Sequence, residues 1–235
     1  MFGIAEREID ALVSSVDYTD ALGVTATEKD ARRACADARA WGFRAVVTLP
    51  HFLGVLVEEL AGTGILAQIP VGYPAGGVTT RVKCVEAEEG LSRGASDLDM
   101  VMDIGAFKGG DYRRVREDIE AVMSVARPFH VPFKVIIEVG VLTDEEKVTA
   151  ARLVRDCGAD FIKTCTGFVP GVLSLRDVSL IRETVGERPR IKASGGIPSI
   201  EDAVACMRAG ASVVAMRHRL IDQLEKAGRR PRGTE

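Results

Sequence analysis

Eight short runs rich in β-branched residues recur along the chain, and stretches with helical periodicity separate them. The runs lie at residues 12–16, 44–49, 64–71, 97–104, 132–139, 160–164, 190–194 and 212–216. Strands that alternate with helices in this way form a parallel sheet, because a right-handed helical crossover carries the chain from each strand to the next. Eight strands joined by seven such crossovers predict an α/β fold, a closed (β/α)8 TIM barrel.

Capping signals between the runs support the same fold. A Ser or Thr precedes the helical stretches at Thr27, Thr79, Thr143, Ser174 and Ser199, usually with an acidic residue three positions later. Glycine before alanine ends three of these stretches, at Gly94, Gly158 and Gly210, where a left-handed cap is expected. We see no interdomain linker. We therefore predict one barrel domain over residues 1–227 and a disordered tail over 228–235, where "GRRPRGTE" has nothing apolar to bury.

Composition narrows the range of partners. The 235 residues carry a formal net charge of -3, so the chain has no overall basic field for nucleic acid or an anionic membrane surface. No stretch approaches the ~20 apolar residues that span a bilayer, and the first ten residues, "MFGIAEREID", include several charged ones. Five cysteines form no CxxC pair and three histidines no HxxxH pair. We expect a soluble, cytoplasmic protein with reduced thiols, no metal site and a small-molecule partner.

Polar residues inside the predicted strands, or directly after the first of them in the case of Asp17, mark the candidate site, since barrel active sites lie at the C-terminal ends of the strands. These residues are Asp17, Asp99, Asp103, Lys134, Glu138, Lys163 and Lys192. Alternation along a strand pairs Asp99 with Asp103, Lys134 with Glu138, and Lys192 with Ser194 on common faces. Several of these side chains must therefore point into the barrel.

Lys163 and Lys192 are the most informative pair. They occupy adjacent predicted strands at similar distances from the strand ends, in "DFIKT" and "RIKAS". Burial beside a second cation lowers a lysine pKa, and a neutral amine is a nucleophile that forms Schiff bases with carbonyls. One lysine would react and the other would tune it. The alternative is that both lysines are ion-paired to Asp99, Asp103 or Glu138 and only hold the barrel together.

Glycine-rich turns offer a phosphate site. Gly167 follows the sixth run in "TGF", and Gly195 and Gly196 follow the seventh in "SGG". A phosphate in this fold is usually held by the loops after strands 7 and 8. A further flexible loop, "GYPAGG" at residues 72–77, follows the third run. Each glycine motif is weak by itself, because turns need glycine anyway.

Taken together, the motifs resemble the deoxyribose-phosphate aldolase family of class I aldolases over nearly the whole chain. They are "VDYTDAL", "GYPAGG", "GASDLDMVMDIGAFKGGDY", "FKVIIEVGVLTDEE", "GADFIKTCTGF" and "IKASGGI". The resemblance implies that Lys163 forms the Schiff base and Lys192 perturbs its pKa, that Asp99 relays protons, and that Asp17 positions a substrate hydroxyl. It implies cleavage of 2-deoxy-D-ribose 5-phosphate to acetaldehyde and D-glyceraldehyde 3-phosphate without a cofactor. A homodimer is compatible with it.

Two segments depart from the family pattern. Val47 in "VVTLP" stands where family members usually carry a cysteine. More importantly, "AMRHRL" at residues 215–220 replaces a small, Ser-rich phosphate loop. Arg217, His218 and Arg219 become candidate substrate-binding residues, because guanidinium groups bind phosphate or carboxylate through charge-assisted forks. The alternative is that the arginines point into solvent.

The sequence is also compatible with other functions. The rebuilt loop is compatible with the same imine chemistry on a different aldehyde or ketone. A barrel that only binds sugar phosphates is another class, although a chain without turnover would not require Asp99, Lys163 and Lys192 together. An enediol isomerase would ordinarily rely on a carboxylate base and would not need paired lysines.

Overall fold

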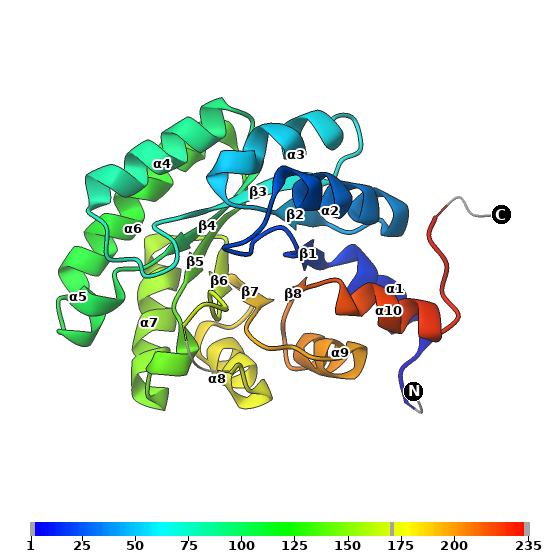
Figure 1. Ribbon diagram of the computed structural model, residues 1–235. Coiled ribbons are helices and arrows are strands. Elements are labelled where there is room, and N and C mark those ends of the chain that lie inside the picture. Colours follow the sequence, from blue (N-terminus) through cyan, green and yellow to red (C-terminus); the bar gives the residue numbers. More distant parts are fainter. Residues whose placement is uncertain (1–2, 170–171, 233–235) are drawn as a thin grey trace.

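The barrel predicted from the sequence is present. The structure is a computed structural model that describes residues 3–169 and 172–232. Eight parallel strands close in sequence order, with β8 paired to β1, and helices surround them (Figure 1). The strands are β1 (Val16–Tyr18), β2 (Ala45–Val47), β3 (Leu66–Val71), β4 (Asp97–Val101), β5 (Phe133–Ile136), β6 (Phe161–Lys163), β7 (Arg190–Ala193) and β8 (Val213–Met216).

The described residues form ten α-helices, five of which begin directly after the predicted capping residues. They are α1 (Glu6–Ser14), α2 (Glu28–Trp41), α3 (Leu53–Glu59), α4 (Thr80–Ser92), α5 (Ile104–Lys108), α6 (Tyr112–Ala126), α7 (Asp144–Cys157), α8 (Leu175–Val185), α9 (Ile200–Arg208) and α10 (Arg219–Lys226), with short 3-10 turns η1 (Pro50–Phe52), η2 (Arg127–Phe129) and η3 (Val139–Val141). Thr27, Thr143 and Ser174 form capping boxes, and Ser199 accepts from the Asp202 amide. Thr79 precedes α4 without a side-chain cap.

The first strand is shorter and later than predicted. Only Val16 of the run at 12–16 lies in a strand, whereas Leu12 belongs to α1. Ile9 and Leu12 bury one face of this helix in the hydrophobic core, so helical periodicity outweighs the β-branched content of "LVSSV". Asp17 therefore lies within β1 and not after it.

The C-terminal segment contacts the barrel in the part that is described. Arg229 forms an ion pair with Asp10, and the amide of Arg232 donates to the carbonyl of Ala40 at 2.6 Å. Residues 233–235 lie outside the described part, so the disordered tail over 228–235 stays a prediction. Within residues 3–169 and 172–232, no helix is long and apolar enough to cross a membrane.

Candidate active site

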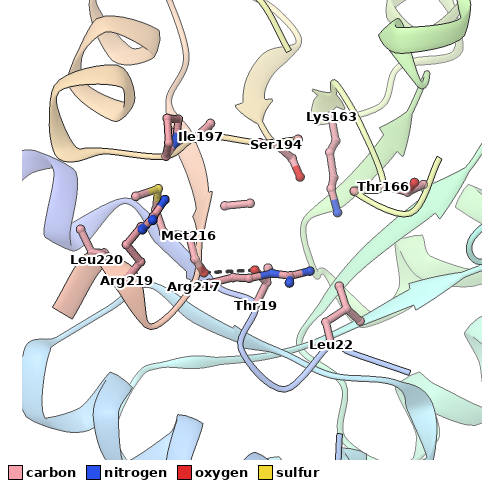
Figure 2. Close-up of a pocket in the computed structure, with 15 residues that line it drawn as sticks. Thr19, Leu22, Lys163, Thr166, Ser194, Ile197, Met216, Arg217, Arg219 and Leu220 are labelled. Carbon is pink, nitrogen blue, oxygen red and sulfur yellow. Dashed lines mark hydrogen bonds between the residues drawn. The ribbon is translucent and has the colours of Figure 1, made fainter. Parts of the chain in front are cut away.

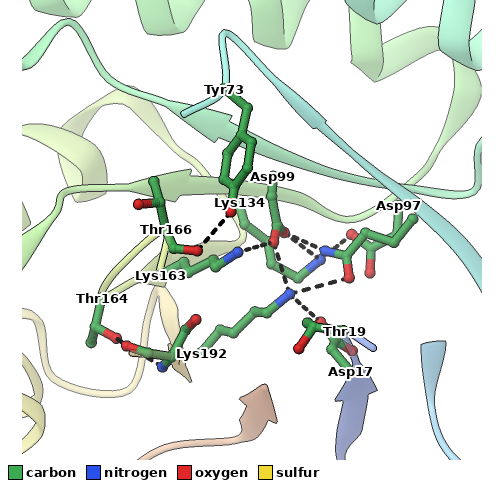
Figure 3. Close-up of polar contacts among 12 residues, drawn as sticks. Asp17, Thr19, Tyr73, Asp97, Asp99, Lys134, Lys163, Thr164, Thr166 and Lys192 are labelled. Atoms are coloured by element: carbon green, nitrogen blue, oxygen red, sulfur yellow. Dashed lines mark hydrogen bonds and ion pairs between the residues drawn. The ribbon is translucent and has the colours of Figure 1, made fainter. Parts of the chain in front are cut away.

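Strand register brings the two lysines together. Lys163 and Lys192 are direct partners in the β6–β7 ladder, and Asp99 reaches them from β4 (Figure 3). The Nζ atom of Lys163 lies 2.7 Å from Asp99 Oδ2, and that of Lys192 lies 2.8 Å from the same oxygen. The expected approach of the two ammonium groups is thus achieved through one shared carboxylate.

Further buried charges surround this contact and form what we call the Lys–Asp cluster. It consists of Asp17, Asp97 and Asp99, the cations Arg44, Lys134, Lys163 and Lys192, and the amide of Gln68. Lys192 Nζ lies 2.5 Å from Asp17 Oδ2 and donates to Gln68 Oε1 at 3.1 Å. Lys134 contacts Asp97 and lies 3.3 Å from Asp99 Oδ1. Only Arg44 in the cluster keeps appreciable exposure, at 17% of its side chain.

Charge balance in the cluster separates the two lysines. Four cations face three carboxylates, so full protonation would leave one surplus positive charge in the barrel interior. Burial and then the charge of Lys192 lower the pKa of Lys163, although Asp99 opposes them. Burial also acts to lower the pKa of Lys192, but Asp17 and Asp99 outweigh it and raise that pKa. Lys163 is therefore the amine that most readily becomes neutral.

A cavity of about 420 Å³ lies at the C-terminal ends of the strands (Figure 2). Lys163 is the member of the cluster that lines this cavity. Lys192, Asp99 and Asp17 lie beneath it and are fully buried. A carbonyl compound in the cavity would thus meet the Lys163 amine first. Asp17, for which the resemblance implied contact with a substrate hydroxyl, contacts Lys192 and Arg44.

All three candidate glycines line the cavity. Gly167, Gly195 and Gly196 have φ values of 82°, 111° and 76°. A Cβ atom at Gly195 would lie 2.8 Å from Cys165 Sγ, so this turn requires glycine both for its left-handed backbone and for space. These glycines leave the loops after β6 and β7 open toward the cavity.

Two of the three candidate residues after β8 also line the cavity. Arg217 and Arg219 are lining residues, and their guanidinium groups point in different directions in Figure 2. Within the described residues neither guanidinium has an ion-pair partner, and no acidic residue lines the cavity. His218 is not brought there. Its Nδ1 lies 3.2 Å from the Tyr18 hydroxyl and 3.8 Å from Asp37 Oδ2, on the outer side of the loop.

Asp103 and Glu138, which strand alternation predicted on the same faces as Asp99 and Lys134, are not part of the Lys–Asp cluster. Asp103 caps α5 by accepting from the Ala106 amide at 2.9 Å and pairs with Arg114. Glu138 accepts from the amide and hydroxyl of Thr166 at 3.0 and 2.6 Å. Both lie beyond the last residues of β4 and β5, where strand alternation no longer governs side-chain direction.

Sequence reasoning missed Arg44, Gln68 and Asp97 as members of the cluster. Gln68 carried a usable signal, because it is the polar residue in the apolar run "GILAQIPV". Its amide donates to Asp99 Oδ1 while its oxygen accepts from Lys192, so it orients both groups. Tyr73 was also missed. Its hydroxyl donates to the carbonyl of Thr166 at 2.7 Å and ties the loop after β3 to the loop after β6.

Among the described residues, no group of three or more His, Cys, Asp or Glu side chains is placed to hold a metal ion. The acidic members of the cluster are instead each in contact with a lysine or arginine. The chemistry available in the cavity is that of an amine, hydroxyls and guanidinium groups.

Comparison with known proteins places this chain in a family. Residues 11–228 match the model of the DeoC/LacD family aldolases. The chain belongs to this family. It is 38% identical over 226 residues to the deoxyribose-phosphate aldolase of Caldanaerobacter subterraneus subsp. tengcongensis. The aligned region covers 95% of this chain and 97% of that protein. The predicted membership in an aldolase family, and hence a lyase, is confirmed.

Solved structures agree with the family assignment. The putative deoxyribose-phosphate aldolase from Coccidioides immitis superposes with a TM-score of 0.89 at 32% identity, covering 94% of this chain and 87% of that one. The deoxyribose phosphate aldolase from Aeropyrum pernix, described as having a unique tetrameric structure, superposes with a TM-score of 0.84 at 27% identity, covering 96% and 99%.

Proposed function

We propose that this DeoC/LacD family member is a Schiff-base aldolase that reversibly cleaves 2-deoxy-D-ribose 5-phosphate to acetaldehyde and D-glyceraldehyde 3-phosphate. One observation carries the mechanism: Lys163 lines the cavity, and its amine rests on a buried cluster with one cation more than carboxylates. The similar proteins named deoxyribose-phosphate aldolase support the choice of substrate.

The reaction begins when Lys163 Nζ attacks the aldehyde carbon C1 of the open-chain sugar. The carbinolamine loses water and becomes a protonated imine. Removal of the proton from the C3 hydroxyl then breaks the C2–C3 bond, and the bonding electrons flow into the imine to give an enamine. The C3 oxygen leaves as the aldehyde of glyceraldehyde 3-phosphate. Protonation of the enamine at C2 and hydrolysis of the imine release acetaldehyde and restore Lys163.

Asp99 and Lys192 act from below the cavity. Asp99 contacts the Lys163 nitrogen directly, and Lys192 contacts the same carboxylate oxygen of Asp99. We therefore assign both residues to proton transfer at that nitrogen and at the carbinolamine oxygen, with water as the carrier. Asp17 holds Lys192 in place at 2.5 Å. We assign it a positioning role.

The phosphate would bind at the other end of the cavity. Gly195 and Gly196 open the backbone of the loop after β7, and Arg217 and Arg219 supply charge from the loop after β8. Because two guanidinium groups replace a compact backbone cradle, we expect weaker discrimination among phosphorylated and other anionic substrates than in relatives with a small loop. This observation favours a second candidate, the same imine chemistry on a larger or differently charged carbonyl compound.

Trapping of the imine tests the proposal. Incubation with acetaldehyde and sodium borohydride should leave a reduced adduct on Lys163, located by peptide mass spectrometry, because reduction locks the imine. Lys163→Met should remove the adduct, whereas the surface variant Lys226→Met should keep it. Labelling confined to surface lysines would contradict the mechanism and would favour a sugar-phosphate-binding barrel or an enediol isomerase.

The quaternary state and the cytoplasmic location stay predictions. The relative from Aeropyrum pernix is described as tetrameric, and we propose at least a homodimer for this chain. Light scattering on the purified protein would measure its mass in solution.

A further inference from the structure

Arg44 connects the Lys–Asp cluster to the opposite end of the barrel. It precedes β2 at the N-terminal ends of the strands, and its outer edge lines a second cavity of about 540 Å³. Its two terminal nitrogens reach inward to different carboxylates. One contacts Asp17 on β1, and the other lies 2.8 Å from Asp97 Oδ2 on β4. Arg44 thus lines the second cavity and not the substrate cavity.

The charge of Arg44 reaches Lys163 through Asp17. Asp17 favours protonation of Lys163 and so opposes the lowering of its pKa. Arg44 offsets part of that negative charge, and it also helps to hold the pKa of Asp17 below its usual value. A guanidinium does not deprotonate at neutral pH. With its three carboxylates ionised, the cluster can therefore lose a proton only from a lysine.

Arg44 gives the Lys–Asp cluster one more cation than carboxylates. With Arg44 present, four cations face three carboxylates, and loss of one proton balances the cluster. Without it, three lysines would already match three carboxylates, and the protonated form of Lys163 would gain stability. Lys134 and Lys192 both contact two carboxylates of the cluster, whereas Lys163 contacts one.

We propose that Arg44 is a positioning residue that sets the charge balance of the Lys–Asp cluster from the N-terminal end of the barrel and thereby keeps Lys163 in its neutral, nucleophilic form. This inference rests on the proposed role of Lys163 as the imine-forming amine. It assigns a part in the reaction to a residue that touches neither substrate nor Lys163.

Other charged groups face these residues and stay unchanged in the variants below. The guanidinium of Arg190 stacks on the Phe161 ring at 4.0 Å, beside Arg44 at 5.8 Å and Lys134 at 5.4 Å from the same ring. On the substrate side, charged or ionisable groups include Glu138 and Tyr73, which hold Thr166, and the cavity-lining Arg217 and Arg219. Because each stays constant, a shift between variants reports the substituted charge.

Three variants test the proposal through the rising limb of kcat/KM against pH, which follows the free amine of Lys163. Arg44→Met removes a cation, raises the pKa of Lys163 and should move the limb to higher pH by about one unit. Asp97→Asn removes a carboxylate and should move the limb to lower pH. The double variant removes one charge of each sign, so its limb should return close to that of wild type.

Two controls separate charge from general damage. Arg44→Lys keeps a positive charge and should keep the limb near its wild-type position. Arg39→Met changes another arginine that lines the same cavity, but Arg39 pairs with Glu59 outside the cluster, so its limb should not move. A purely structural role for Arg44 would lower kcat in Arg44→Met without moving the limb.

Borohydride labelling and the pH profile together separate a failure of the aldolase mechanism from a failure of the role proposed for Arg44. Failure of borohydride to label Lys163 at any pH would remove the aldolase mechanism itself. Normal labelling with an unmoved limb in folded Arg44→Met would overturn only the role of Arg44. If Arg44→Met does not fold, the comparison of Asp97→Asn with the double variant decides: coincident limbs would show that Arg44 has no influence.

Discussion

At the scale of single residues, Lys163 and Lys192 show how surroundings separate two identical side chains. Both amines lie within 2.8 Å of one carboxylate oxygen. Lys192 has a second carboxylate, Asp17, at 2.5 Å, and this contact outweighs the cost of burial. Lys163 lacks such a partner and opens into the cavity. The direction of each pKa shift, and with it the assignment of nucleophile and partner, follows from one additional ion pair.

Arg217 and Arg219 give a prediction at the same scale. If either guanidinium binds the substrate phosphate, its replacement by alanine should raise KM for 2-deoxyribose 5-phosphate and lower kcat/KM about ten- to a hundredfold, because a charge-assisted hydrogen bond contributes ~1.5–3 kcal/mol. Steady-state kinetics with a neutral aldehyde serve as the control and should hardly change. Wild-type kinetics in both single variants would leave Gly167, Gly195 and Gly196 as the anion site.

At the scale of elements, a buried ion pair fastens α4 to α6 and to the loop after β3. Lys83 is fully buried, and its Nζ lies 2.5 Å from Asp118 Oδ2 and donates to the carbonyl of Val101 at 3.0 Å. Gly72 packs against the Lys83 stem, where a Cβ atom would come within 2.8 Å of Cε. This loop carries Tyr73 to the carbonyl of Thr166, so helix packing outside the barrel supports a residue that lines the cavity.

Removal of either Lys83 or Asp118 should destabilise the fold, because it leaves the other charge buried without a partner. Lys83→Met leaves the Asp118 carboxylate without its cation and should lower the free energy of unfolding by about 3–5 kcal/mol, measured by urea denaturation. Lys83→Met with Asp118→Leu should recover much of this loss. The exposed pair Arg113–Glu117 supplies the control, and Arg113→Ala should cost less than about 1 kcal/mol. A loss in Lys83→Met no larger than in this control would show that the pair does not hold α4.

At the scale of the whole molecule, the charged barrel interior couples folding to pH. Burial acts to raise the pKa of Asp99, but Lys163, Lys192 and Lys134 outweigh it and hold that pKa well below its ordinary value. Lys192 and Arg44 likewise outweigh burial at Asp17. A carboxyl whose pKa is lower in the folded state stabilises the fold above its unfolded pKa, and this contribution is lost as pH falls toward the folded pKa.

Asp97 acts in the opposite direction, because burial raises its pKa, but the two carboxyl groups with lowered pKa outnumber it. Acid should therefore destabilise the barrel. The free energy of unfolding should decrease below about pH 4, by up to about 1.4 kcal/mol per pH unit for each proton taken up on unfolding. Urea denaturation between pH 7 and pH 3 measures this slope. Asp17→Asn removes one of the responsible carboxyl groups, and its slope should be shallower. Parallel curves for wild type and Asp17→Asn would mean that other acidic groups control acid unfolding.

The sequence by itself determined the architecture, and it singled out the two lysines that we propose to act in the reaction. Periodic alternation of strand and helix is a local property, and so are capping residues such as Thr143 and Ser174, so both can be read without coordinates. A lysine in an apolar strand is equally visible, because burial of charge is unusual enough to require a reason. Local signals were ambiguous in one place, at residues 12–16, where tertiary packing of α1 decided for helix.

Only the tertiary structure decided which groups meet. Arg44, Gln68 and Asp97 come from different strands or loops, and their contacts depend on barrel closure and strand register, which no local pattern specifies. The separation of Arg217 and Arg219 from His218 depends on how the chain turns between β8 and α10. The sequence thus identified the amine that we propose to react, whereas only the fold showed which charges surround it, because electrostatic interactions act through distance in space and not along the chain.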